Sequence, residues 1–186
     1  GKLAETYPIS LSDTPAEQFH SYPGDLNNED HRHTVYSEGP FIGYRYYTSN
    51  KIPVRFPFGY GLSYTQFMLD NTSHELFPAE TPDAPALTVT TLLHNTGNKD
   101  GKETIQLYIG TPEKEQPVKI LKQFQKVFVP AGESKKVSLT LCQKDLMVYS
   151  VEKKQFHVPE GEYNLYLGTS VENISYQAGF VPIKKS

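Results

Sequence analysis

Residues 102–110 of the chain read Lys-Glu-Thr-Ile-Gln-Leu-Tyr-Ile-Gly and follow a period of two. The aliphatic residues Ile105, Leu107 and Ile109 are separated by one Gln and one Tyr. Since successive side chains of a β-strand point to opposite faces, the three aliphatic residues would line one face and the Gln and Tyr the other. The segment is therefore predicted to be a strand with one face in an apolar core.

Similar short segments occur on both sides of this strand, separated by turn signals such as Asn95-Thr-Gly97-Asn98 and Pro130-Ala-Gly132-Glu133. Further strands are predicted at residues 87–94, 117–129 (one or two strands), 134–141, 146–149, 156–158, 163–168 and 176–183. About seven short strands at spacings near 8–12 residues indicate an all-β fold, an antiparallel β-sandwich of immunoglobulin or fibronectin type III type. The chain has one Cys and no Trp, so the Cys-Trp-Cys signature of antibody domains is absent and the fibronectin-like form is favoured.

Residues 1–67 have a different character, with many Pro, Gly, Tyr, His and charged residues and no sustained period of 2 or 3.6. The six prolines at positions 8, 15, 23, 40, 53 and 57 disfavour a long helix, because each removes a backbone donor and restricts the residue before it. A long extended N-terminal arm is predicted, with one helical turn near residues 11–19, where Ser12 or Asp13 could act as the cap.

The length and composition of the chain exclude several classes of protein. A length of 186 residues is too short for a (β/α)8 barrel, which needs roughly 250. A net charge of −3 gives no basic excess for nucleic acid or an anionic membrane, and no apolar run approaches the roughly 20 residues of a membrane span. Cys142 is the single cysteine, so an intramolecular disulfide and a multi-cysteine metal site are excluded. The chain begins Gly1-Lys2 without Met, and we expect it to be a fragment of a longer protein.

The arm carries the most specific motifs: Val35-Tyr-Ser-Glu-Gly39-Pro-Phe-Ile-Gly43-Tyr-Arg-Tyr-Tyr47 and Pro53-Val-Arg-Phe-Pro-Phe-Gly59-Tyr-Gly61-Leu-Ser-Tyr-Thr-Gln-Phe67. Together with Gly1-Lys-Leu-Ala-Glu-Thr-Tyr-Pro8, they resemble the C-terminal region of glycoside hydrolase family 3 β-glucosidases. The second part of the chain is similar to the fibronectin type III-like domain of that family through Asn95-Thr-Gly97, Gly101-Lys-Glu, Gln106-Leu-Tyr108, Leu121-Lys-Gln-Phe124, Pro130-Ala-Gly132-Glu and Gly161-Glu-Tyr. The resemblance covers nearly the whole chain, and Pro40 departs from it where the family usually has an aliphatic residue.

The resemblance implies a division into an arm, residues 1–67, which would be the tail of the family's α/β sandwich domain and a linker, and a fibronectin type III-like domain, residues 68–186. It also implies a parent enzyme that hydrolyses terminal β-glucosidic bonds with retention, using an Asp nucleophile in a barrel domain and an acid/base Glu in the α/β domain. Neither motif can be matched in this chain, so no catalytic residue, metal or cofactor is assigned and the chain alone is expected to be inactive. The implied partners are the barrel and α/β domains of the same enzyme, with β-glucosides bound through the parent.

The arm supplies the candidate site residues, each of which has a structural and a functional interpretation. Glu38 and the two arginines could form ion pairs that fasten the arm or could lie at the rim of the parent's active site. The aromatic rings could pack against neighbouring domains, which is the favoured interpretation, or stack on sugars. Gly59 and Gly61 would let the backbone turn or approach another element closely. The substrate-rim or domain-interface candidates are Glu38, Tyr44, Arg45, Tyr46, Tyr47, Arg55, Phe56, Phe58, Tyr60 and Tyr64.

Three weaker kinds of feature carry little functional weight. Residues 29–33, Glu-Asp-His-Arg-His, have poor spacing for a metal and are interpreted as a solvated loop. Asn71-Thr-Ser73 and Asn173-Ile-Ser175 fit the N-glycosylation pattern, which is short enough to occur by chance. Cys142 is expected to be a small buried or half-buried apolar residue.

Three roles remain open for the chain. The leading hypothesis is a non-catalytic structural domain that stabilises the catalytic domains, with the arm from Tyr36 to Phe67 joining them. The second is a carbohydrate-binding module, which the absence of Trp disfavours. The third is an oligomerisation domain that pairs subunits through an edge strand or the arm. The sequence fixes neither the sugar and linkage nor the cellular location.

Overall fold

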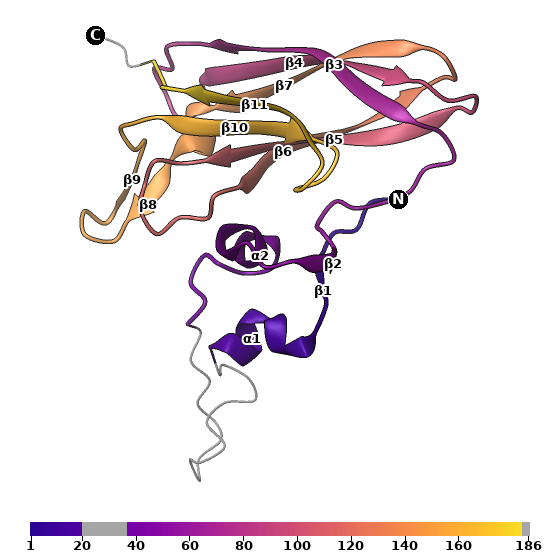
Figure 1. Cartoon of the computed structure of the whole chain (residues 1–186). Helices are drawn as coiled ribbons and strands as arrows, with labels where there is room; N and C mark the ends of the chain where they lie inside the picture. Colours follow the sequence, from indigo (N-terminus) through magenta and orange to yellow (C-terminus); the bar gives the residue numbers. More distant parts are fainter. Residues whose placement is uncertain (20–36, 184–186) are drawn as a thin grey trace.

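Two antiparallel sheets face each other in the computed structural model, which describes residues 1–19 and 37–183 (Figure 1). One sheet has the strand order β11-β10-β5-β6 and the other β3-β4-β7. Their bounds are β3 Phe67–Leu76, β4 Pro85–Asn95, β5 Gly101–Gly110, β6 Ile120–Val129, β7 Ser134–Cys142, β10 Tyr163–Gly168 and β11 Ile174–Phe180. The predicted all-β, fibronectin type III-like sandwich is confirmed by this arrangement.

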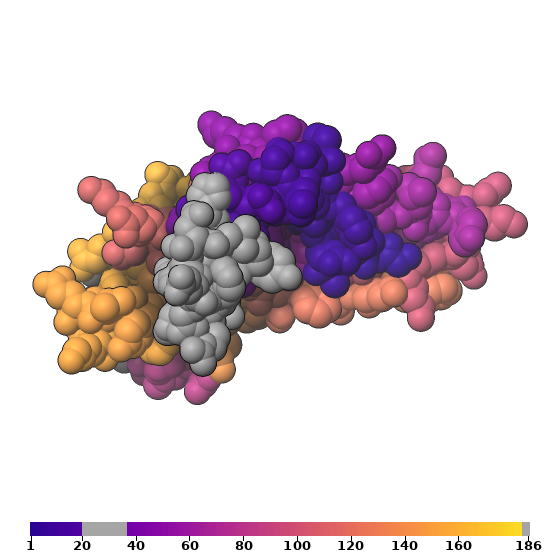
Figure 2. Space-filling model, turned by 90° about the horizontal axis from the view of Figure 1, so that it is seen from below, coloured from indigo at the N-terminus to yellow at the C-terminus, as the bar shows by residue number. Residues whose placement is uncertain are grey.

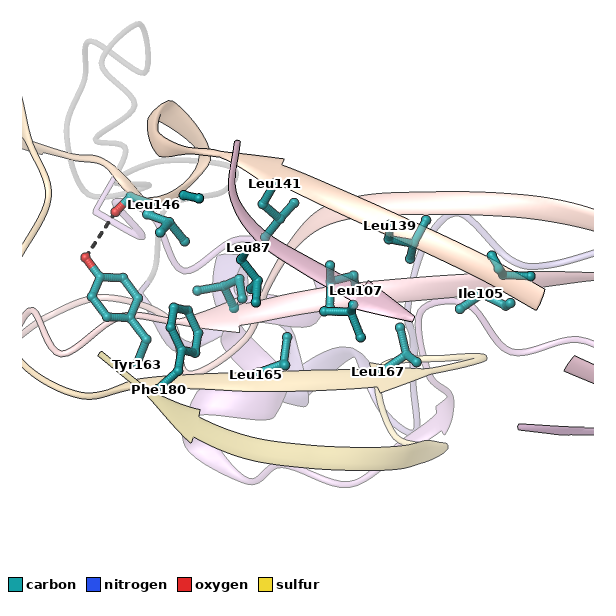
Figure 3. Close-up of a cluster of buried hydrophobic side chains, with 14 of the residues drawn as sticks. Leu87, Ile105, Leu107, Leu139, Leu141, Leu146, Tyr163, Leu165, Leu167 and Phe180 are labelled. Carbon is teal, nitrogen blue, oxygen red and sulfur yellow. Dashed lines mark hydrogen bonds between the residues drawn. The ribbon is translucent and has the colours of Figure 1, made fainter. Parts of the chain in front are cut away.

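The core between the sheets follows the alternation in the sequence. Ile105, Leu107 and Ile109 of β5 are fully buried. They lie beside the aliphatic residues of the neighbouring strand β10 and face those of β7 in the other sheet (Figure 3). Tyr163 is also fully buried, and its hydroxyl donates to the backbone oxygens of Leu146 at 3.2 Å and Pro159 at 3.1 Å. These bonds satisfy the one polar atom of a large apolar side chain, so the ring can lie in the core at little cost.

Strand β3 was not predicted from the sequence. Phe67 and Leu69 pack against the core, but the strand then runs through polar residues, and the register with β4 shifts between Asp70 and Ser73. Asn71 lies in this irregularity with a φ of 48°. Because the bulge breaks the period of two at the edge of a sheet, the pattern that identified the other strands is missing here.

Other strand bounds differ in detail from the prediction. Residues 117–129 contain one strand, β6, and the last strand, β11, begins and ends earlier than residues 176–183. The expected short pair is present as the hairpin of β8 (Val148–Ser150) and β9 (Gln155–His157), which lies beside the sandwich and belongs to neither of its sheets (Figure 1). The 3-10 helix η2 (Gln143–Leu146) joins β7 to this hairpin.

The arm contains local structure and lies below the four-stranded sheet in Figure 1. Strands β1 (Tyr7–Pro8) and β2 (Val54–Phe56) pair with each other, and the helical turn expected near residues 11–19 is present as η1 (Leu11–Asp13) and α1 (Pro15–Gln18). Helix α2 (Tyr44–Asn50) was not predicted. Its seven residues fit between Pro40 and Pro53, and both flanking residues, Gly43 and Lys51, have a φ of 55°.

Candidate functional site

The outer face of the four-stranded sheet is covered by the arm. Gln106 and Tyr108 of β5 point away from the core, as the alternation predicted, yet they are 3% and 0% exposed. Helix α2 and the segment that follows β2 lie over them (Figure 1). The face that the sequence alone would leave to solvent is therefore an internal interface.

A buried polar contact lies at the centre of this interface. The Tyr108 hydroxyl donates to the Gln106 side-chain oxygen, and the Gln106 amide donates to the backbone oxygen of Thr169 at 2.9 Å. Gly59 packs directly on this amide, since a Cβ at Gly59 would lie 2.6 Å from Gln106 Nε2. Gly59 also has a φ of 83°. The expected close backbone approach at this glycine is confirmed, and no other residue type would fit without a shift.

Tyr44, the first residue of α2, forms the second contact between arm and sheet. Its ring stacks on Phe58 with centroids 4.7 Å apart and meets Tyr108 edge-on at 6.0 Å. Its hydroxyl accepts a hydrogen bond from the backbone N–H of Leu121 in β6 at 2.8 Å. Tyr44 thus contributes apolar area, ring contacts and a hydrogen bond to the same interface.

Both ends of the arm are also fixed to the sandwich. Near the N-terminus, Lys2 Nζ lies 3.0 Å from the Glu103 carboxylate. Near the start of β3, the Thr65 hydroxyl donates to Asn95 Oδ1 at 2.6 Å. The amide of Asn95, a residue 1% exposed, donates to the backbone oxygens of Lys99 at 2.7 Å and Val129 at 3.0 Å. Asn95 therefore joins the arm, the β4–β5 turn and the end of β6.

Burial shifts the pKa values of several side chains at and near the interface. Burial raises the pKa of Tyr108, with a smaller contribution from Tyr44, and burial also raises the pKa of Tyr47. Burial lowers the pKa values of Lys119, which immediately precedes β6, and of Lys122, which lies within β6. The Lys119 ammonium lies 4.9 Å from the Tyr166 ring centroid and donates to the Val171 backbone oxygen at 2.9 Å. These groups hold elements together and present no acid/base pair to an open cleft.

The structure divides the predicted site residues into four groups. Tyr44 and Phe58 lie in the interface with the sandwich, and Tyr46 and Tyr47 are buried within the arm, where Tyr46 meets the Phe19 ring edge-on at 6.0 Å. Among the polar candidates, Glu38 is half-buried in the turn before α2, the guanidinium carbon of Arg45 lies 5.9 Å from the Tyr44 ring centroid, and Arg55 is exposed. The remaining rings are more open and belong to Phe56, Tyr60 and Tyr64, which are 38%, 37% and 99% exposed.

Sequence reasoning missed the sandwich side of the interface. Gln106, Tyr108, Leu121 and Thr169 were not among the candidates, although all four contact the arm or hold a residue that does. The Tyr on the outer face of the strand at residues 102–110 was the available signal, but a single aromatic residue on a strand face is too common to predict a covering segment. Which segment supplied that cover depended on the tertiary structure.

No metal centre is found in the part of the chain that the structure describes. There, no group of three or more His, Cys, Asp and Glu side chains is placed to hold a metal ion. The weak motif at residues 29–33 lies outside the described residues. Cys142 is half-buried and free. Among residues 1–19 and 37–183, helices long and apolar enough to cross a membrane are also absent.

Comparisons with known proteins agree with this geometry. Residues 103–171 match the fibronectin type III-like domain family. Thermostable β-glucosidase B of Acetivibrio thermocellus is 39% identical over 176 residues, which are 94% of this chain and 22% of that protein. The structure of β-glucosidase 3B from Thermotoga neapolitana in complex with glucose superposes with a TM-score of 0.84 at 33% identity, covering all of this chain and 24% of the other. The chain is homologous to the C-terminal region of glycoside hydrolase family 3 β-glucosidases.

The chain spans about a quarter of the length of the relatives that it matches. Another relative, 36% identical over 177 residues, is the exo-α-(1→6)-L-arabinopyranosidase of Bifidobacterium longum, of which the chain again covers 22%. The matched region therefore occurs in proteins that are named for different sugars and linkages. The match covers only part of these multidomain enzymes, which is consistent with adjoining domains.

Proposed function

We propose that the chain is the non-catalytic C-terminal part of a β-glucosidase and that its sandwich acts as a structural domain that stabilises the catalytic domains. The observation that supports this role most directly is the buried interface between arm and sandwich. Tyr108 is fully buried under Tyr44, and Gln106 is sealed by the Gly59 backbone. Because this sheet face is already occupied by another segment of the same chain, it fits a structural role better than a role in binding a ligand.

The chemistry of the parent enzyme would come from other domains. Retaining hydrolysis of terminal β-glucosidic bonds requires two carboxyl groups about 5–5.5 Å apart, one as nucleophile and one as acid/base. Neither family motif for these residues is matched in the 186 residues. The proposal therefore assigns the arm and sandwich a role in stability and in holding domains together.

The test is an assay of the 186-residue chain on p-nitrophenyl β-glucoside, with the full-length polypeptide that carries it as the positive control. The isolated chain should give no turnover above the buffer, and the full-length polypeptide should release p-nitrophenol. Turnover by the isolated chain, in preparations from two different hosts, would overturn the assignment as a non-catalytic part. An inactive full-length polypeptide would overturn the assignment of the parent.

One observation favours the carbohydrate-binding alternative. Tyr149 and Phe156 on the β8–β9 hairpin are 48% and 67% exposed, with ring centroids 5.1 Å apart. Exposed rings of this kind can stack on sugars. Calorimetry of the chain with cello-oligosaccharides and laminarin distinguishes the two roles: saturable binding at millimolar concentrations, lost in a Tyr149→Ala, Phe156→Ala variant, would favour the module.

A further inference from the structure

A cavity opens at the end of the sandwich, at the base of the β8–β9 hairpin. Its volume is about 900 Å³, which lies within the range of small-molecule sites in proteins. The tail after β11 and three connections enclose it, namely those between β3 and β4, between β7 and β8, and between β9 and β10. Figure 2 shows the indigo residues of the arm over the middle of the molecule, with the orange hairpin to one side of them. We call this space the end cavity.

Hydrogen bonds hold the walls of the end cavity in place. The side-chain amide of Gln143 donates to the backbone oxygen of Ala79 at 3.1 Å. The Tyr163 hydroxyl donates to the backbone oxygens of Leu146, as Figure 3 shows, and of Pro159. Because these bonds join different connections to one another, little further ordering is needed when a ligand binds.

The end cavity has an apolar floor and an acidic rim. Its floor includes Ala79, Ala86 and Leu146, which are buried. Glu80 and Glu160 also line it but are exposed, so their carboxylates lie where the cavity opens to solvent. Among the described residues that line the cavity, none is Lys, Arg or His. The rim therefore carries negative charge only.

We propose that the end cavity binds a small organic cation, a compound with an apolar ring or chain and one ammonium group. The apolar part would gain free energy from the area that it buries on the floor. The ammonium group would remain at the rim, attracted by two carboxylates and still partly in water. Glu80 and Glu160 also have contacts within the chain, but a carboxylate has acceptor sites for more than one donor.

Other ligand classes fit this cavity less well. A carboxylate or phosphate compound would meet like charge at the rim. A neutral sugar would lose water from several hydroxyls that an apolar floor cannot replace. The proposal goes beyond the structural role proposed above and does not depend on it, because the end cavity is separate from the interface between arm and sandwich.

The experiment compares three ligands that share a phenylethyl group and differ in charge: 2-phenylethylammonium, 2-phenylethanol and 3-phenylpropionate. Each is titrated into the unsubstituted 186-residue chain while amide chemical shifts are followed by NMR. The ammonium compound should bind with a dissociation constant of about 1 mM, at least about fivefold more tightly than the alcohol, and the carboxylate should bind most weakly. The shifts should be confined to residues that line the end cavity.

A double variant locates the cation at the rim. Glu80→Gln with Glu160→Gln should weaken binding of the ammonium compound about fivefold and leave binding of the alcohol unchanged. Glu152→Gln is the matched control, because Glu152 is exposed on the hairpin turn and does not line the cavity. It should change neither affinity. All three substitutions are at exposed positions, so the fold should persist.

Three results would overturn the proposal: equal affinity for the three ligands, no saturable binding up to about 10 mM, or shifts at amides away from the cavity. Unchanged binding of the ammonium compound by the double variant would do the same. A capped Leu-Lys-Leu peptide is titrated in parallel. If it binds at least about tenfold more tightly than the amine, the cavity is a docking site for a protein segment and the small-molecule assignment is wrong.

Discussion

The hydroxyl of Tyr44 accepts a hydrogen bond at 2.8 Å from the backbone N–H of Leu121, 77 residues away in the sequence. The bond links the first turn of α2 to β6, close to the point where the register of β6 with β5 shifts between Leu107 and Tyr108. A backbone donor at such an irregularity needs a partner from outside the ladder. The arm supplies it.

Replacing Tyr44 by Phe should therefore destabilise the 186-residue chain by about 1–2 kcal/mol, because the Leu121 N–H would lose its acceptor while the ring contacts remain. Urea unfolding measures this change. Tyr64→Phe is the control, since Tyr64 is 99% exposed and should lose nothing. Equal stability of the two variants would show that water replaces the Tyr44 hydroxyl without cost.

Two glycines allow the destabilisation caused by steric overlap to be measured separately from the destabilisation caused by backbone strain. Gly59 has a φ of 83° and lies against Gln106 and Ser170, whereas Gly132 has a φ of 72° and nothing within 4 Å of an added Cβ. Gly132→Ala should cost about 1–2 kcal/mol from the left-handed conformation alone. Gly59→Ala should cost roughly 1–3 kcal/mol more, because its Cβ would overlap buried atoms. Equal losses in urea unfolding would contradict the tight packing of the arm on the sheet.

Replacing the buried polar residue Asn95 is predicted to lower the free energy of unfolding. Asn95→Ala would leave the backbone oxygens of Lys99 and Val129 and the Thr65 hydroxyl without their partner, and should cost about 2–4 kcal/mol. Asn98→Ala on the same turn is exposed and should change the free energy of unfolding by less than about 0.5 kcal/mol. A similar small change for both variants, measured by chemical unfolding, would show that the Asn95 bonds contribute little.

Alkaline pH should weaken the interface between arm and sandwich. Burial raises the pKa of Tyr108 above the value of about 10 expected in the unfolded chain. The folded state then holds the proton more tightly, so this stability is fully present below about pH 10 and is lost as the pH rises further. In melting curves between pH 8 and 11, Tyr108→Phe should show a shallower decline than the parent chain. Tyr149→Phe, half-exposed, should follow the parent; parallel curves for all three proteins would refute a role for Tyr108 ionisation.

Removing the arm should expose the face that it covers. A chain of residues 68–186 would present Tyr108 and Gln106 to water and would lack the Thr65 partner of Asn95. We expect it to melt at a lower temperature than the 186-residue chain and to bind an apolar fluorescent dye more strongly. Unchanged melting and dye binding would show that the sandwich is independent of the arm and would support a domain boundary between residues 67 and 68.

The part of the fold that could be predicted is the part with a regular period. The aliphatic residues of β5, β7 and β10 alternate along each strand, and all of them are buried as the alternation required. Strand β3 escaped prediction because a bulge at Asn71 interrupts its period, and α2 because its seven residues are too few to repeat a helical pattern. The motifs of the arm predicted the homology, which the comparisons confirm.

The sequence by itself thus determined the class of fold, the core-facing residues and the family, since local periods and ordered motifs are properties of neighbouring positions. It also listed the aromatic residues of the arm, without their partners. Only the tertiary structure decided that Tyr44 and Phe58 cover the chain's own sheet while Phe56, Tyr60 and Tyr64 remain more open. The reason is physical: which buried surface a ring meets depends on contacts between segments tens of residues apart, and no local pattern encodes that choice.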